Sequence, residues 1–182
     1  ISFISDKLKV YEFEVKWGVK TTTGDREGNI IETSSYLPEK KHIEEKLKNF
    51  VGNIFQKPPK ASAVKINGKR AYLRFRNNES FETKGKIVKI NSLKFIDQPR
   101  HNISVIQVEC GKGFYVRSFA NDLARSLNTK AHLYSLKRTK VGNFTIKNSI
   151  LLDDLLKISE MGFGITGFHS SISMLDDILA FK

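Results

Sequence analysis

The residues of this chain best suited to chemistry follow a glycine turn. A short apolar strand predicted to end at Glu109 leads into Gly111-Lys112-Gly113 and then Phe114-Tyr115-Val116-Arg117. Glycines allow a tight turn, or a close approach to a ligand where a Cβ would obstruct it. Tyr115 and Arg117 offer a phenol and a guanidinium two residues apart, on one face if the segment is extended. This pattern predicts a binding or catalytic site.

An amphipathic helix should follow this turn and support it. Phe119, Leu123 and Leu127 recur at helical spacing, which predicts a helix over residues 118–127 that ends near Asn128. Similar patterns predict strands at 10–17, 29–32, 86–96, 102–109 and 136–146, the last with a bulge at its glycine. Further helices are expected from Pro38 to a stop at Gly52, and at 71–76, 151–158 and 174–181. The residues alone therefore indicate a mixed α/β domain.

The chain is strongly basic. Its 182 residues include 31 Lys and Arg against 19 Asp and Glu, which gives a formal net charge of +12 and a pI near 9.8. Such a charge favours a polyanionic partner, of which nucleic acid is the commonest. A coding bias toward Lys, Ile and Asn would raise the charge too, but it would spread the lysines evenly.

The basic residues instead gather in one segment. Between Lys57 and Lys89 there are ten basic and two acidic side chains, and the segment opens on Pro58-Pro59 and contains an Asn67-Gly68 turn signal. We expect residues 57–85 to form an arm that closes over a phosphate backbone. The candidates for binding RNA or DNA are Lys57, Lys60, Lys65, Lys69, Arg70, Arg74, Arg76 and Lys84. The alternative is a solvated, mobile insertion.

Several other classes of protein fit the sequence poorly. The single cysteine, Cys110, excludes an internal disulfide and suits a small apolar filler in a reducing compartment better than a nucleophile. The four histidines are too scattered for a zinc site, and His132 is expected to make structural hydrogen bonds. No membrane span, signal peptide, P-loop or GxGxxG is found. We expect a cytoplasmic protein without a zinc site.

Three stretches, in this order, carry a resemblance to a known family. They are PP-x-x-SA-x-K-x-x-G-K-x-x-Y at 58–72, C-x-KG-x-Y-x-R-S at 110–118 and AHL-x-x-L-x-RT-x-x-G-x-F at 131–144. The strand at 9–15, the TTTGDREG turn at 21–28 and the tail SISMLDDILAF agree with them. Over nearly its whole length the chain resembles the TruB-type tRNA pseudouridine synthases.

The resemblance implies a fold and an activity. The fold is α+β, with a mixed, mainly antiparallel sheet flanked by helices, and residues 57–85 would be the inserted thumb of one catalytic domain. The family isomerises a uridine in the T-loop of tRNA to pseudouridine, without metal or cofactor. The expected partner is therefore the T-arm of tRNA, bound by a monomer.

The same resemblance implies a role for each site residue. Tyr11 would stack on the flipped uracil and assist proton movement, because a base must leave its stack before it can react. Arg117 would pair with the catalytic carboxylate and keep it ionised. Tyr115 would line the pocket and donate a hydrogen bond, Leu136 would pack beneath the base, and Lys112 and Asp25 would border the pocket.

Two departures from the family qualify this expectation. The family's nucleophile is an aspartate in a G-H-x-G-x-L-D-P loop, which is not in this sequence, and neither Asp25 nor Asp122 stands in its place. We therefore expect the chain by itself to be inactive, as a catalytic-domain fragment. Thr22 stands where the family commonly has an aspartate, and the RNA-binding module that often follows is not in the chain.

Two other functions are kept open. A non-catalytic module that binds or folds tRNA would use the same cleft and arm. A guide-RNA-dependent relative of the family would need additional protein partners.

Overall fold

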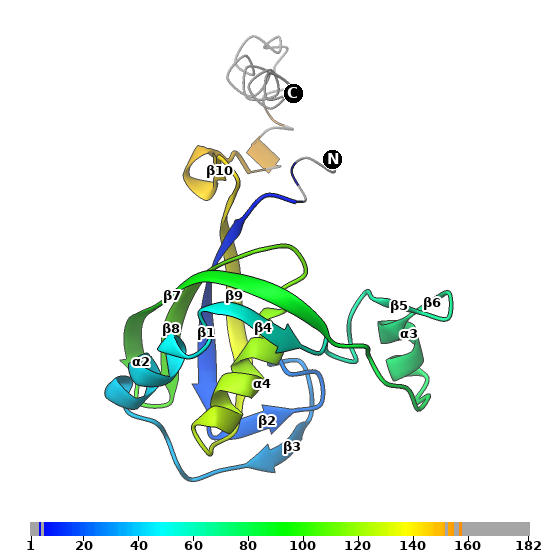
Figure 1. The fold of residues 1–182 in the computed structure, drawn as a ribbon, viewed down its shortest axis with the longest axis horizontal. Helices are drawn as coiled ribbons and strands as arrows, with labels where there is room; N and C mark the ends of the chain where they lie inside the picture. Colours follow the sequence, from blue (N-terminus) through cyan, green and yellow to red (C-terminus); the bar gives the residue numbers. More distant parts are fainter. Residues whose placement is uncertain (1–3, 5, 152, 155–156, 158–182) are drawn as a thin grey trace.

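The computed structural model describes residues 4, 6–151, 153–154 and 157 (Figure 1). Its centre is a six-stranded sheet in the order β10-β9-β1-β8-β7-β4, in which every pair of neighbours is antiparallel. The strands are β1 (Lys9–Trp17), β4 (Gly52–Gln56), β7 (Lys86–Arg100), β8 (Ile103–Cys110), β9 (Ala131–Val141) and β10 (Phe144–Thr145). The predicted α+β fold is confirmed. The helices predicted at 151–158 and 174–181 lie largely or wholly outside the described residues.

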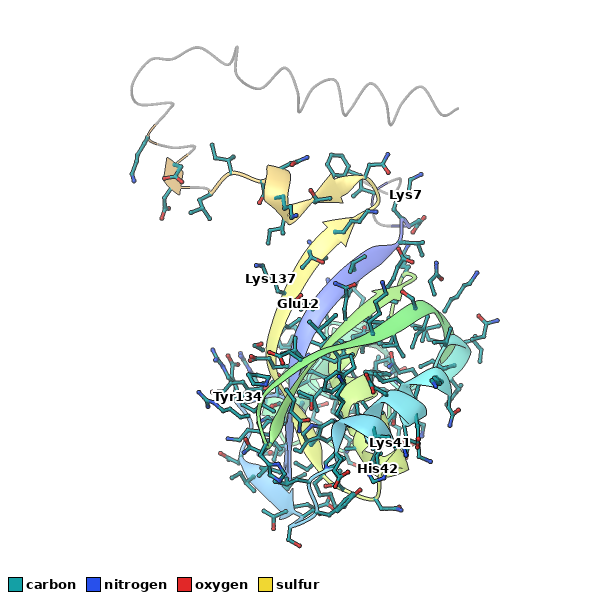
Figure 2. All side chains as sticks on the ribbon, turned by 90° about the vertical axis from the view of Figure 1, so that its left-hand side faces the viewer. Lys7, Glu12, Lys41, His42, Tyr134 and Lys137 are labelled. Atoms are coloured by element: carbon teal, nitrogen blue, oxygen red, sulfur yellow. The ribbon has the colours of Figure 1, made fainter. Side chains whose placement is uncertain are left out.

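Strand β1 lies in the centre of the sheet, and its side chains alternate between the core and the opposite face. Phe13, Val15 and Trp17 face the core and are buried, while the residues between them face the other side. The indole N–H of Trp17 donates to Ser104 Oγ at 2.9 Å, so the one polar atom of this buried ring is satisfied. Figure 2 shows β1 and β9 side by side along their length, and within this pair Glu12 lies opposite Lys137.

Helices α2 (Lys40–Lys48) and α4 (Val116–Ser126) lie in front of the sheet in Figure 1. Both contribute an apolar stripe to a single core. At its centre the ring of Phe119 lies 5.9 Å from that of Phe13, 5.3 Å from Phe50 and 5.7 Å from Phe114, centre to centre. These spacings are typical of stabilising aromatic pairs. The rotation of α4 about its axis is thereby fixed.

Four details differ from the sequence prediction. Helix α2 begins at Lys40, so Pro38 precedes it, and it ends at Lys48 rather than at Gly52. Gly52 instead starts the edge strand β4, which is short and lacks a clear alternation of polar and apolar residues. Strand β9 starts at Ala131 because its first residues are buried under α4. Gly142 lies in the turn to β10, and the bulges occur where β9 shifts its register against β1.

A small hairpin carries the loop that matters for the site. It consists of β2 (Val19–Thr21) and β3 (Ile30–Thr33), close to the predicted return strand. The Glu32 carboxylate pairs with Lys130 and Lys20, and their hydrogen bonds lower the pKa of Glu32 to about 2. Asp25, in the loop of this hairpin, forms a bridge with Leu133 of β9. The Glu32–Lys130 pair and the Asp25–Leu133 bridge thus bind the β3 strand and the loop of the hairpin to the start of β9.

The arm projects from the body at the right of Figure 1. It contains β5 (Lys65–Ile66), β6 (Lys69–Arg70) and α3 (Ala71–Arg76), and α3 agrees with the predicted helical turns. The Asn67-Gly68 turn between the strands has positive φ at both residues, as a tight hairpin requires. Arg74 fastens the arm together, because its guanidinium donates to Glu79 at 2.6 Å and to the Ile66 carbonyl at 3.3 Å.

Replacing Phe119 with alanine should be severely destabilising. The ring is fully buried and contacts three other phenyl rings, so the substitution leaves a cavity that the sheet cannot close. We expect a loss of about 3–5 kcal/mol in the free energy of unfolding, measured by urea denaturation. The size-matched control, Phe55→Ala, removes a ring that is 61% exposed and should cost about 1 kcal/mol or less. Equal losses for the two variants would contradict this account of the core.

Candidate functional site

The predicted Tyr-x-Arg segment forms the start of a helix rather than an extended stretch. Tyr115 is the N-cap of α4, and Val116 is its first residue. The helix begins here because Val116, Phe119 and Ala120 start its buried stripe. Tyr115 and Arg117 therefore do not share one face of a strand, and the premise of that prediction was wrong. Arg117 instead lies in the first turn of α4, on the side away from the core.

Arg117 joins three segments of the chain. Its Nη1 donates to Asp25 Oδ2 at 3.1 Å and to the Thr23 carbonyl at 3.3 Å, and its Nη2 donates to the Ala61 carbonyl at 2.8 Å. The side chains of Arg117 and Asp25 are only 25% and 24% exposed. The hairpin loop, the root of the arm and α4 thus meet on one guanidinium, whose planar fork is suited to several acceptors at once.

The loop holds Asp25 firmly for this pairing. Asp25 Oδ1 accepts from Thr23 Oγ1 at 2.6 Å and from the Glu27 main-chain N–H at 3.2 Å, and the Asp25 carbonyl accepts from Thr21 Oγ1 at 2.6 Å. Gly24 has a φ of +77°, and a Cβ there would lie 3.0 Å from the Asn121 amide nitrogen. Only glycine satisfies both conditions without strain, so the loop can rest directly on α4.

Two cavities flank the Asp25–Arg117 pair. One, of about 340 Å³, is lined by Asp25, Leu133, Tyr134 and Leu136. The other, of about 260 Å³, lies toward the arm and is lined by Asp25, Arg117, Tyr72, Phe75 and Arg76, among others. Leu136 is 49% exposed, so its side chain is accessible to a ligand. Leu136 therefore lines one cavity and Arg117 lines the other, and Asp25 lines both.

Tyr11 lies in β1, beside the strand that carries Leu136. It is paired with Arg138 in β9, and its neighbour Phe13 is paired with Leu136. Because residues two apart on a strand share a face, Tyr11 and Leu136 lie on the same face of the sheet. Tyr11 is half-buried against the core. Its predicted stacking on a base stays a prediction.

Tyr115 and Lys112 are placed differently from the other site residues. The hydrogen bonds described for Tyr115 come from its main chain: its N–H donates to Gln56 Oε1 at 2.7 Å, and its carbonyl accepts from Gln56 Nε2 at 3.1 Å. Lys112 pairs with Asp6 at 2.6 Å through two exposed side chains. The roles predicted for both residues stay predictions.

Sequence reasoning missed Gln56 and Thr23. Gln56 is only 1% exposed and fixes the start of α4 through both of its amide atoms. A single glutamine in a strand has no pattern of its own, because its partner lies 59 residues away. Thr23 does carry a signal, because Thr and Asp in a glycine-containing turn commonly make local hydrogen bonds.

The basic residues of the arm differ in accessibility. Arg74 is the least exposed, at 19% of its side chain, because it is bound within the arm. Lys57 lies 4.0 Å from Glu82, Lys60 lies over the ring of Phe81, and Arg76 lies over Tyr72. Lys65, Lys69, Arg70 and Lys84 are exposed. The arm presents mostly accessible cations, apart from Arg74.

Other kinds of site find little support in the described part of the chain. There, no group of three or more His, Cys, Asp and Glu is arranged to hold a metal ion. His132 Nδ1 lies 2.8 Å from the Val19 carbonyl, which agrees with the structural role predicted for it. Among the helices described, none is long and apolar enough to cross a membrane.

Comparison with known proteins places this arrangement in a class. The model of the TruB family pseudouridylate synthase N-terminal domain matches residues 1–116. The tRNA pseudouridine synthase B of Caulobacter vibrioides is 41% identical over 159 residues, covering 87% of this chain and 51% of the relative. That of Wolbachia pipientis subsp. Culex pipiens is 44% identical over 159 residues, covering 86% and 45%. The chain thus spans about half the length of the curated relatives it matches.

Solved structures agree on the fold. A Cbf5–Nop10–Gar1 complex matches 89% of this chain and 40% of its own with a TM-score of 0.63 at 21% identity. An H/ACA RNP bound to a substrate RNA containing 2′-deoxyuridine matches 89% of this chain and 38% of its own with a TM-score of 0.61 at 17% identity. Fold and sequence together define a pseudouridylate synthase class. Within it, the chain belongs to the TruB family.

Cys110 should be inert in the folded protein. The side chain is fully buried, and burial raises the pKa of its thiol to about 12. Since the thiolate is the reactive form, the raised pKa leaves almost no nucleophile at mildly alkaline pH. We expect Ellman's reagent at pH 8 to label Cys110 only after unfolding in guanidinium. Rapid labelling of the native protein would show that the thiol is accessible.

Proposed function

We propose that this chain provides the uridine-binding and RNA-binding surfaces of an enzyme that isomerises a T-loop uridine of tRNA to pseudouridine. The observation that carries the proposal is the position of Asp25, which pairs with Arg117 and lines a hollow together with Leu136 in a TruB-family chain. The relatives named tRNA pseudouridine synthase B support tRNA as the substrate. The hollow receives the extruded uracil, with Leu136 beneath it and Tyr11 stacking on it.

Asp25 acts as a positioning residue rather than as the nucleophile. Oδ1 accepts two hydrogen bonds and Oδ2 is paired with Arg117, so the carboxylate is held by its own loop. A carboxylate bound in this way attacks a sugar or base poorly. The reaction therefore needs the aspartate of the family's G-H-x-G-x-L-D-P loop, which Arg117 would orient and keep ionised. Residues 1–182 alone should bind tRNA without modifying it.

The arm supplies the contact with the tRNA backbone. Its exposed cations lie on a segment that projects from the body and joins it at Ala61, beside Arg117. An RNA held by the arm would therefore reach the hollow directly. We keep the predictions that the enzyme works as a monomer and in the cytoplasm, where tRNA is used.

Pseudouridine mapping tests the proposed function. A polypeptide that carries residues 1–182 together with the family's aspartate loop is incubated with unmodified tRNA, and pseudouridine is then located by carbodiimide modification and reverse transcription. We expect one stop, in the T-loop. Tight binding with an unchanged T-loop uridine would show a binding protein instead of an enzyme.

Arg117→Ala should abolish turnover while tRNA affinity stays within several-fold. The guanidinium is directed at Asp25 and two carbonyls, so it contributes little to phosphate binding. Arg117→Lys should rescue poorly, because one ammonium cannot reproduce the planar fork. Single-turnover rates and filter binding measure the two effects separately. A collapse of affinity together with activity would make Arg117 a phosphate contact.

Neutralising Lys65, Lys69 and Arg70 by substitution with glutamine should weaken tRNA binding and flatten its salt dependence. Each lost phosphate contact lowers the slope of log K against log salt by about one. The matched control neutralises Lys41, Lys46 and Lys48 on α2, which lies on the other side of the molecule from the arm (Figure 1). Both variants lose the same charge. Equal slopes for the arm variant and the parent would rule out the arm as an RNA contact.

A further inference from the structure

A third and larger cavity lies on the other side of the Asp25 loop. It has a volume of about 650 Å³, in the range of small-ligand sites, and is bordered by the β2–β3 hairpin, β4, α4 and the root of the arm, most of them labelled in Figure 1. Thr23 and Gly24 line this groove, and Thr23 and Asp25 line the hollow toward the arm. Only the loop segment Thr23–Gly24 thus separates the groove from the Asp25–Arg117 pair.

One wall of the groove is an aromatic platform. Phe55 lines the groove and is 61% exposed, which is a large apolar surface to leave in water. The tip of its ring lies against the chain at Gly85, where an added Cβ would be 2.1 Å from the ring carbon Cζ. Glycine at this position leaves room for the ring. The ring is therefore held at its tip while most of the residue stays accessible.

The remaining walls are basic and rich in hydrogen-bonding groups. Lys20, Lys57, Lys60 and Arg125 all border the groove, and Ser118 and Asn121 add a hydroxyl and an amide. Asp122 also borders it but is paired with Arg125. Lys57 and Lys60 belong to the arm as well, so a phosphate backbone held by the arm continues to the mouth of the groove.

We propose that this groove binds one unstacked nucleotide of the substrate RNA, a neighbour of the target uridine. The base stacks on Phe55, and its phosphate is held by Lys57 and Lys60. A fixed aromatic face beside cations is the arrangement that binds single-stranded nucleotides without base pairing. This inference rests on the proposed function for its choice of RNA. Asn121 lies one helical turn beyond Arg117 and donates to its carbonyl, so the two sites share one helix and one loop.

The test combines a protein variant with an altered RNA. The RNA is a fluorescein-labelled hairpin of T-arm sequence, and its binding to residues 1–182 is followed by fluorescence anisotropy. Phe55→Ala should raise the Kd roughly tenfold through lost stacking. Ile87→Ala is the matched control: Ile87 is paired with Phe55 in the sheet and is 63% exposed, and its substitution should change the Kd by less than about twofold.

Abasic sites show whether the lost affinity belongs to a base. Hairpins with one abasic nucleotide at each position beside the target uridine are compared. At one position, removing the base should weaken binding to the parent protein about as much as Phe55→Ala weakens binding of the intact RNA. At that same position, removing the base should cause no further loss of affinity for the Phe55→Ala variant. Equal losses for parent and variant at every position, or an unchanged Kd for Phe55→Ala, would overturn the proposal.

A separate turnover assay keeps the two hypotheses distinct. If the parent with its aspartate loop forms no pseudouridine, the proposed function fails, while coupling between Phe55 and one base would still establish the nucleotide site. If pseudouridine forms but no abasic position is coupled to Phe55, the groove inference fails alone. Thermal unfolding of Phe55→Ala, compared with the parent, excludes a loss of binding through misfolding.

Discussion

The candidate site depends on one guanidinium that binds three partners. Arg117 binds a carboxylate and two carbonyls from separate segments, and the hairpin loop and the root of the arm converge on it. A partly exposed ion pair adds only about 0–1 kcal/mol to stability, so its importance is geometric. Without Arg117 the carbonyls of Thr23 and Ala61 would lose this donor, while the bond from Ser118 Oγ to the Lys57 carbonyl would still hold the root of the arm to α4.

The core determines where this guanidinium points. Phe119, Ala120 and Leu123 bury one side of α4 against the sheet, so Arg117 and Asn121 lie on the side that meets the hairpin loop. Gln56 then fixes the start of the helix by binding both main-chain groups of Tyr115. Stability and function are therefore coupled through the helix: the packing that orders the protein also sets the position of the charge.

The sequence predicted those elements whose own pattern specifies them. Strand-like residue patterns predicted β1, β7 and β8. Helix-like patterns predicted α4 and the short helix α3. It failed where distant contacts decide: β4 exists because it pairs with β7, and Tyr115 is an N-cap because Gln56 binds it. Asp25 was placed at the pocket through a resemblance, yet its pairing with Arg117, 92 residues away, has no local signal.

The charges of the arm also have two separate tasks. Arg74 is bound within the arm and maintains its shape, whereas the exposed lysines extend from a segment that the sheet does not cover. The total charge of the protein determines its long-range attraction for a nucleic acid. The positions of rigidly held charges determine how the nucleic acid is aligned on the protein. The arm is bound to α4 at Ala61 by Arg117 and at Lys57 by Ser118, so a change in the arm's position is passed to the first turn of this helix through two hydrogen bonds. If the proposed function is right, α4 links substrate capture to the alignment of the reacting groups.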